Sequence, residues 1–244
     1  MRPQSSLSVV SRLCLALLVL LPPVAGAQAA PGIFVTPVAG APFSGTVMIQ
    51  RTVLQPDGTQ MRLWSERQIG RDNAGRIYSE FRPLRPQSDT APPPLQRVLI
   101  YDPQSRMSVS LFPQNKLYRM VILKRPPRVD TPEDFASPSA QAQPPSQFTH
   151  TLDLGYKTIF GLQAHGVRVN ETLPASESGT GSEVIVSDEY WYSEDLRINL
   201  RSIHSDPRTG TVQFTLTGIN RTAPSENLFA VPADYKMAGM TPAH

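Results

Sequence analysis

Apolar and polar residues alternate along much of the chain from Phe43 onward, a pattern typical of β-strands with one buried and one solvated face. The first run, FSGTVMIQRTVL, is followed by the turn residues Pro56-Asp57-Gly58, and the next, QMRLWSERQI, is followed by GRDNAGR. Both turns contain residues that preset a bend or tolerate positive φ. Together with RIYSEF, these runs predict a meander of antiparallel strands.

Further strands are predicted after the proline-rich break RPLRPQSDTAPPP, in the runs QRVLIYD, RMSVSLF and KLYRMVIL. In the middle run, Met107, Val109 and Leu111 alternate with serines, which predicts one buried and one wet face. The last run is apolar at both parities, so we expect that strand to be covered on both faces.

A proline-rich stretch at residues 124–147 has neither a strand period nor a helix period, and we interpret it as a loop or linker inserted near the middle of the domain. Such an insertion can act as a flap over a site or simply lie on the surface, and we favour the surface insertion. The strand pattern resumes in TLDLGYKTIFGLQAHGVRVNETL, SEVIVSDEYWYS and LRINLRSI. Only PSENLF has the pattern of a helix start, and it is one turn long.

The stretch SIHSDPRTGTVQF places His204, Ser205 and Asp206 next to one another, as a catalytic cluster would. The alternating runs on both sides make residues 206–210 a hairpin connection, with Asp at the first turn position, Pro at the second and Gly210 at the exit. In an extended strand Ser205 points away from the face shared by His204 and Asp206, so the hydroxyl and the imidazole cannot meet. We therefore interpret the stretch as a hairpin in which Asp206 accepts backbone N–H groups of its own turn.

The remaining polar motifs define no specific catalytic or cofactor site. The histidines are widely spaced, and none stands at a zinc-ligand interval from another histidine or a carboxylate. Glycine-rich phosphate loops and a serine elbow are absent from the sequence, so we expect no metal, no cofactor and no catalytic residue. The segment SDEYWYSED, at residues 187–195, has the composition of an acid–base pair or a sugar platform. We favour aromatic rings packed on a sheet, with the carboxylates flanking a turn.

Residues 1–29 have the order of a cleavable secretory signal peptide, because Arg2 and Arg12 precede an apolar run from Leu13 to Leu21 and small residues follow. As a helix this run would be about 14 Å long, against about 30 Å for the hydrocarbon core of a bilayer, so we expect no membrane span after cleavage. The single cysteine lies inside the run, which leaves the mature chain without disulfides, thiolate metal sites or a cysteine nucleophile. We therefore expect a periplasmic or secreted protein.

Charge and length favour one domain without a nucleic-acid partner. The chain has 23 basic and 20 acidic side chains, and loss of Arg2 and Arg12 leaves 21 against 20. The basic residues occur singly, whereas a nucleic-acid backbone requires clusters. We predict a flexible segment at residues 30–41, one antiparallel β domain at residues 42–237 and a flexible tail at residues 238–244.

Residues 152–237 carry a G-x-x-A-x-G bend, an aromatic-rich strand, the hairpin H-S-D-P-R-x-G and a closing L-F-x-V-P-x-D-Y, an order that resembles a family of uncharacterised secreted bacterial proteins. The front half, with FSGTVMIQR and LIYDPQSRMSVSLFPQNKLYRMVI, is similar in layout to the LolA, LolB and RseB group of periplasmic carriers and sensors. That resemblance implies an all-β fold with a strongly curved antiparallel sheet. This half-barrel would receive an acyl chain or a protein segment on its concave apolar face. The carriers close the concavity with helices, whereas little helix is predicted here.

A binding protein is the function that this resemblance favours. We expect a non-enzymatic protein that binds an apolar ligand, such as an acyl chain or a lipid, or an apolar segment of a partner such as a lipoprotein. The candidate contacts are alternate apolar residues of two late strands: Ile198, Leu200, Val212, Phe214 and Leu216. Two alternatives stay open, an envelope scaffold protein without a small ligand and a hydrolase whose site is dispersed along the sequence.

Overall fold

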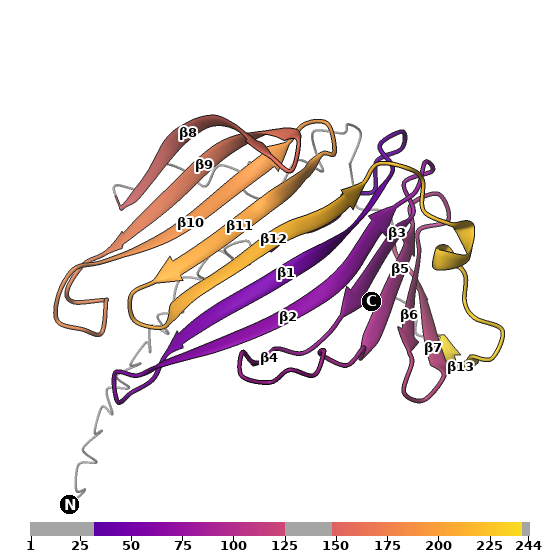
Figure 1. The fold of residues 1–244 in the computed structure, drawn as a ribbon, viewed down its shortest axis with the longest axis horizontal. Helices are drawn as coiled ribbons and strands as arrows, with labels where there is room; N and C mark the ends of the chain where they lie inside the picture. The colour runs from indigo at the N-terminus through magenta and orange to yellow at the C-terminus, as the bar shows by residue number, and fades with distance from the viewer. Residues whose placement is uncertain (1–31, 125–147, 241–244) are drawn as a thin grey trace, which may run out of the picture.

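The computed structural model describes residues 32–124 and 148–240, and nearly all regular elements in these ranges are β-strands (Figure 1). The predicted signal peptide, most of the proline-rich insertion and the end of the tail lie outside the described residues. The predicted all-β fold with little helix is confirmed, since the one helical element within those ranges is the single turn η3 (Glu226–Phe229). The strands are β1 (Phe43–Leu54), β2 (Gln60–Arg71), β3 (Ile77–Phe81), β4 (Arg85–Pro86), β5 (Arg97–Asp102), β6 (Met107–Phe112), β7 (Leu117–Ile122), β8 (Thr149–Ile159), β9 (Leu162–Leu173), β10 (Val184–Ser193), β11 (Ile198–Asp206), β12 (Gly210–Asn220) and β13 (Lys236–Met240).

The strands of the described ranges form a single sheet. Its order is β13-β7-β6-β5-β3-β2-β1-β12-β11-β10-β9-β8, and the short β4 pairs with β2. Neighbouring strands are antiparallel except at one edge, where β13 runs parallel to β7. β1 pairs with both β2 and β12, so it joins the N-terminal meander to the C-terminal group. Figure 1 shows the sheet curving strongly from edge to edge, which confirms the predicted curved, half-barrel arrangement.

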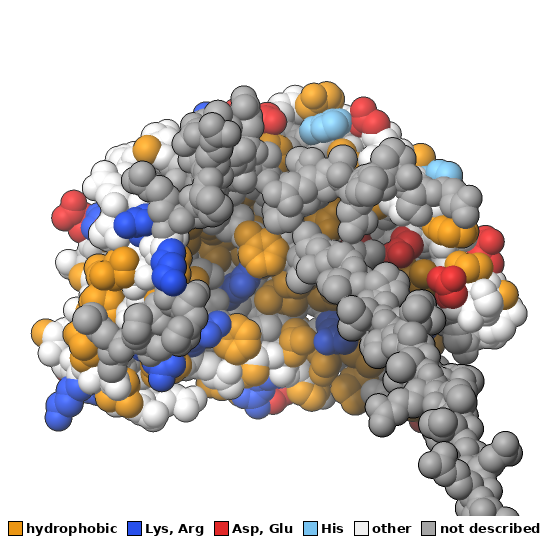
Figure 2. Space-filling model, turned by 180° about the vertical axis from the view of Figure 1, so that it is seen from behind, with side chains coloured by type: hydrophobic (Ala, Val, Ile, Leu, Met, Phe, Trp, Pro, Cys, Tyr) orange, Lys and Arg blue, Asp and Glu red, His pale blue; other side chains and the backbone are white. Residues whose placement is uncertain are grey.

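The strand register assigns each side chain to one of two faces, because residues opposite each other in a ladder point to the same side. Val47 on β1 is opposite Leu216 on β12 and Arg67 on β2. These three residues define what we call the inner face, which lines the hollow seen in Figure 2. The alternate positions form the outer face, where Met48 is opposite Glu66.

Residues 32–41 cover one end of the inner face. Ile33 and Val38 are buried, and Arg67 Nη2 donates a hydrogen bond to the carbonyl oxygen of Ile33 at 2.7 Å. This differs from the flexible segment predicted for residues 30–41, because its apolar side chains find a place against the sheet. Ile33 belongs to a first core, whose buried members are Ile33, Phe43, Val47, Ile69, Leu162, Ala164, Trp191, Leu196, Ile198, Leu200 and Leu216.

The guanidinium group of Arg71 fixes this segment to the sheet. Arg71 is the last residue of β2, and its side chain is fully buried on the inner face. Nε donates to the carbonyl oxygen of Ala41 (2.8 Å), Nη1 to that of Thr36 (2.8 Å) and Nη2 to that of Leu196 (2.6 Å). Burial lowers the pKa of Arg71 to about 10, so the group stays charged at neutral pH. One side chain thus joins residues 32–41, the end of β2 and the turn between β10 and β11.

A second core lies on the outer face of β5 and β6, against the C-terminal segment. Val109 and Leu111 of β6 are buried there with Phe229 of η3. The predicted alternation in β6 is therefore confirmed, with its serines on the inner face. β7 is not covered on both faces as predicted, because it lies near the sheet edge and the second core reaches one side only. Tyr118 packs partly against that core, and Ile122 is exposed.

The C-terminal segment returns to the sheet as β13, which pairs with β7. The ion pair between Lys116 Nζ and Asp234 Oδ2 (2.8 Å) and the hydrogen bond from Lys236 N to Lys116 O (2.9 Å) align its start. A tail was predicted to begin at residue 238. Strand pairing instead extends through residue 240, because the outer core brings this segment beside β7.

Replacing Arg71 with Met should destabilise the fold. The change leaves the carbonyl oxygens of Ala41, Thr36 and Leu196 without their donor, at a cost of about 1–3 kcal/mol for each buried group. We expect the free energy of unfolding, measured in urea, to fall by roughly 3 kcal/mol. Arg62→Met, an exposed position of the same strand, is the control and should change it by less than about 0.5 kcal/mol. Equal stability of the two variants would contradict the role of Arg71.

Candidate functional site

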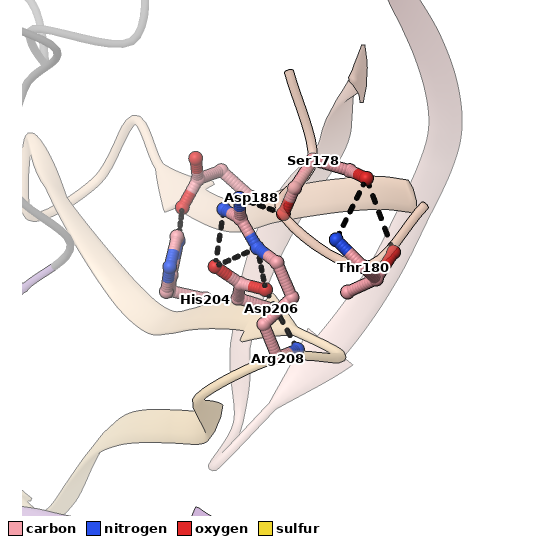
Figure 3. Close-up of polar contacts among 6 residues, drawn as sticks. All are labelled: Ser178, Thr180, Asp188, His204, Asp206 and Arg208. Atoms are coloured by element: carbon pink, nitrogen blue, oxygen red, sulfur yellow. Dashed lines mark hydrogen bonds and ion pairs between the residues drawn. The ribbon is translucent and has the colours of Figure 1, made fainter. Parts of the chain in front are cut away.

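The β11–β12 hairpin confirms the interpretation of the stretch SIHSDPRTGTVQF (Figure 3). Residues 207–209 join the strands, and Asp206 is opposite Gly210. Asp206 Oδ1 accepts the backbone N–H of Arg208 at 2.9 Å, and the guanidinium of Arg208 donates to both carboxylate oxygens. The hydrogen bonds from the Arg208 side chain lower the pKa of Asp206. As predicted, Asp206 accepts a backbone N–H of its own turn.

His204 does not form a triad with the adjacent serine. Its Nδ1 lies 2.8 Å from Oδ1 of Asp188, which is opposite His204 on β10 (Figure 3). Ser205 points to the other face, where its Oγ lies 3.2 Å from Oγ1 of Thr211. The predicted separation of hydroxyl and imidazole is therefore confirmed, and Ser205 cannot act as a nucleophile for His204.

Two histidine–carboxylate pairs cannot be recognised from the spacing of these residues along the sequence. His204 pairs with Asp188, and His165 Nε2 lies 2.8 Å from Oδ1 of Asp153. The partners are 16 and 12 residues apart along the chain and lie on neighbouring strands, so only the register reveals them. Over residues 32–124 and 148–240, no group of three or more His, Cys, Asp or Glu side chains could hold a metal ion.

The aromatic residues of the segment 187–195 pack in the sheet, as predicted. Trp191 is buried, and its Nε1 donates to Glu189 Oε1 at 2.5 Å, while Arg168 Nη2 forms an ion pair with Glu189 at 2.7 Å. Burial alone would raise the pKa of Glu189, but the hydrogen bonds from Trp191 and Arg168 lower it. The prediction that the carboxylates flank a turn is wrong for Asp188 and Glu189, which lie within β10 and have cross-strand partners.

The structure separates the predicted ligand contacts into two sets. Ile198, Leu200 and Leu216 are buried in the first core. Val212 and Phe214 keep some exposed surface, and Phe214 packs at the margin of that core. Of the five predicted contacts, only Val212 and Phe214 are therefore accessible from solvent while residues 32–41 stay in place.

Some large apolar side chains on the inner face are exposed. Met61 on β2 is 44% exposed, Phe81 on β3 is 47% exposed and Leu99 on β5 is 36% exposed. Met61 lies on the same side of β2 as Arg71, which is opposite Ile77 on β3, and the β3–β5 ladder carries this face to Leu99. Figure 2 shows hydrophobic side chains gathered in the hollow. We call the following set the open apolar strip: Met61, Phe81, Leu99, Val212 and Phe214.

Sequence reasoning missed the first three of these residues, because alternation marks apolar positions without saying which face of the sheet is concave. The sequence contains one signal for two of them: RIYSEF ends with an apolar residue, Phe81, and QMRLWSERQI has another, Met61, at its second position. Both stand where a strand leaves the covered part of the sheet. Only the register shows that they lie on the same face of the sheet as Phe214.

Several solved structures have similar folds. The complex of MucA and MucB from Pseudomonas aeruginosa matches at 14% identity and a TM-score of 0.42, covering 81% of this chain and 58% of that chain. A LolA superfamily protein from Nitrosomonas europaea matches at 10% identity, with a TM-score of 0.30 and coverages of 78% and 90%. The lipoprotein LppX from Mycobacterium tuberculosis matches at 11% identity, with a TM-score of 0.27 and coverages of 74% and 88%. This chain thus matches little more than half the length of the MucB chain.

No family model matches the chain, and neither does any curated protein. The resemblance of residues 152–237 to a secreted bacterial family therefore stays a hypothesis. At these identities and TM-scores, the similarities give no basis for assigning a ligand, a partner or a site residue to this chain. Among the residues that the structure describes, no helix has both the length and the apolar character needed to cross a bilayer.

Replacing Gly210 with Val should destabilise the β11–β12 hairpin. Gly210 has a φ of +110°, and a Cβ there would lie 1.9 Å from the carbonyl oxygen of Thr52 on β1. Overpacking and a strained φ each cost about 1–3 kcal/mol, so we expect thermal and urea unfolding to show a loss of at least about 2 kcal/mol. Thr209→Val, at the exposed neighbouring position, should change stability by less than about 0.5 kcal/mol. Unchanged stability of the glycine variant would show that this hairpin geometry is wrong.

Proposed function

We propose that this protein is a periplasmic or secreted binding protein without catalytic activity, which holds an acyl chain against the open apolar strip. The observation that carries the proposal is the exposure of Met61, Phe81 and Leu99 in the hollow of the sheet. Contiguous exposed apolar surface is unfavourable in water and marks sites of ligand or partner binding. A concave apolar surface is also the common form of small-molecule sites.

The strip continues across the middle of the sheet. Phe214 on β12 is opposite Ile49 on β1, and Ile49 is opposite Ser65 on β2. The hydroxyl of Ser65 donates to the carbonyl oxygen of Arg82 at 3.1 Å, directly after Phe81. An extended chain laid across these strands therefore contacts apolar groups from β12 to β3.

Burial of an acyl chain on this strip supplies enough free energy for useful affinity. Each buried methylene contributes about 0.8 kcal/mol, so a chain with about fourteen methylenes gains roughly 11 kcal/mol. Association costs at least about 4 kcal/mol, which leaves a dissociation constant on the order of 10 μM.

The two alternatives differ in how the structure bears on them. A hydrolase is less well supported, because Ser205 lies on the opposite face from His204 and its Oγ bonds to Thr211. A scaffold protein requires that the strip binds nothing, which a binding experiment decides. A partner's apolar segment would use the same strip and would compete with the acyl chain.

Solvent extraction and native mass spectrometry of gently purified protein, followed by titration with a fluorescent fatty acid, test the proposal. We expect co-purifying lipid or saturable binding that excess unlabelled fatty acid displaces. Phe81→Ser should weaken binding about tenfold, because it removes roughly 1.4 kcal/mol or more of apolar contact. Ile185→Ser is the matched control, since Ile185 is 50% exposed on the outer face and should not contribute. Neither bound lipid nor saturable binding would favour the scaffold protein.

A further inference from the structure

On the strands from β12 to β7, charged side chains are divided by sign between the two faces of the sheet. Seven strands are involved: β1, β2, β3, β5, β6, β7 and β12. Their acidic residues, Glu66, Glu80 and Asp102, all lie on the outer face, opposite Met48, Val98 and Met107. The charged residues that these strands place on the inner face are arginines: Arg51, Arg67, Arg71, Arg97 and Arg119. On β10 and β11, by contrast, Asp188 and Asp206 lie on the inner face, where they pair with His204 and Arg208.

Two of these arginines are structural, because Arg67 and Arg71 donate to carbonyl oxygens of the segment that covers the inner face. Arg97 and Arg119 differ, since both are exposed. Within residues 32–124 and 148–240, neither of them forms an ion pair. Arg51, opposite Val212 on β12, is likewise exposed and forms no ion pair within these ranges, so three positive charges face the hollow without a counter-charge from the described chain.

Arg97 and Arg119 lie beside the part of the open apolar strip that contains Phe81 and Leu99. The guanidinium carbon of Arg97 is 5.6 Å from the centroid of the Phe81 ring. Leu99 is opposite Ser110, and Ser110 is opposite Arg119, so the second arginine ends a row that begins at the strip. Strand spacing and rise place the two arginine Cα atoms about 12 Å apart. The Arg97 guanidinium lies over Phe81 of β3, and Arg119 lies on the same face of the sheet, two strands from β5, on β7.

We propose that the hollow binds an anionic amphiphile, with its acyl chain on the open apolar strip and its carboxylate or phosphate group held by Arg97 and Arg119. This inference rests on the proposed function and adds the chemistry of the ligand's head group. The planar guanidinium matches carboxylate and phosphate oxygens with paired N–H donors, which a lysine cannot do. The hydroxyl of Ser110, between Leu99 and Arg119, adds a further donor on the same face.

Calorimetric titration with dodecanoate, dodecyl phosphate and dodecanol tests the head-group preference, since the three probes share one chain length. We expect wild-type protein to bind at least one of the anions about tenfold more tightly than dodecanol, a difference of roughly 1.4 kcal/mol. The double variant Arg97→Gln/Arg119→Gln should lose this preference and keep its affinity for dodecanol. The anion with the larger loss identifies the head group. Added salt should weaken anion binding and leave dodecanol binding unchanged.

Arg62→Gln is the matched control, because Arg62 is equally an exposed strand arginine but lies on the outer face, opposite Thr52. It should keep the full anion preference, and equal melting temperatures of all variants would show that the fold is intact. Equal binding of dodecanol and both anions, or a double variant that keeps the preference, would overturn the head-group inference and leave the proposed function standing. Absence of binding by all three probes would remove the proposed function as well. Binding of an acidic peptide without an acyl chain, but not of dodecanoate, would assign the face to a protein partner and overturn the inference.

Discussion

The buried guanidinium of Arg71 is the contact on which the shape of the hollow depends. A buried charge of this kind is stable only when its donors are satisfied, and carbonyl oxygens from residues 32–41 and from Leu196 accept them. The contact closes one end of the inner face and keeps the apolar side chains of the first core away from water. The same strands leave the other end open, where Val212 and Phe214 keep exposed surface. The position of the Arg71 side chain thus explains why one end of the inner face is covered and the other end is accessible to solvent.

The location of the second core has a complementary effect. Phe229 and its neighbours cover the outer face of β5 and β6, so the apolar residues that stabilise these strands are buried outside the hollow. The inner face of the same strands is then free to carry serines, Arg97 and Leu99. A single curved sheet is stabilised here by cores on opposite faces at its two ends, which leaves a continuous inner surface between them for a ligand.

Much of the fold follows from the sequence, because alternation and turn residues are local signals. The predicted strands and the hairpin at residues 206–210, with Gly210 at the turn exit, are confirmed. The buried Arg71 is not predictable in this way, since an arginine in an alternating run indicates a solvated position. Its three acceptors, moreover, lie 30, 35 and 125 residues away from it in the chain. The pairing of His204 with Asp188 and the assembly of the open apolar strip likewise depend on register between strands that the sequence does not place side by side.

The central claim is that the inner face of the sheet holds an acyl chain, and a crystal structure with a fatty acid brominated at the end of its chain tests this most directly. Anomalous scattering locates the bromine without reference to the protein's own density. The account predicts a bromine peak in the hollow, over the open apolar strip, with the carboxylate within hydrogen-bond distance of Arg97 or Arg119. A bromine peak on the outer face, for example against Ile185, together with a hollow that holds no chain, would contradict it.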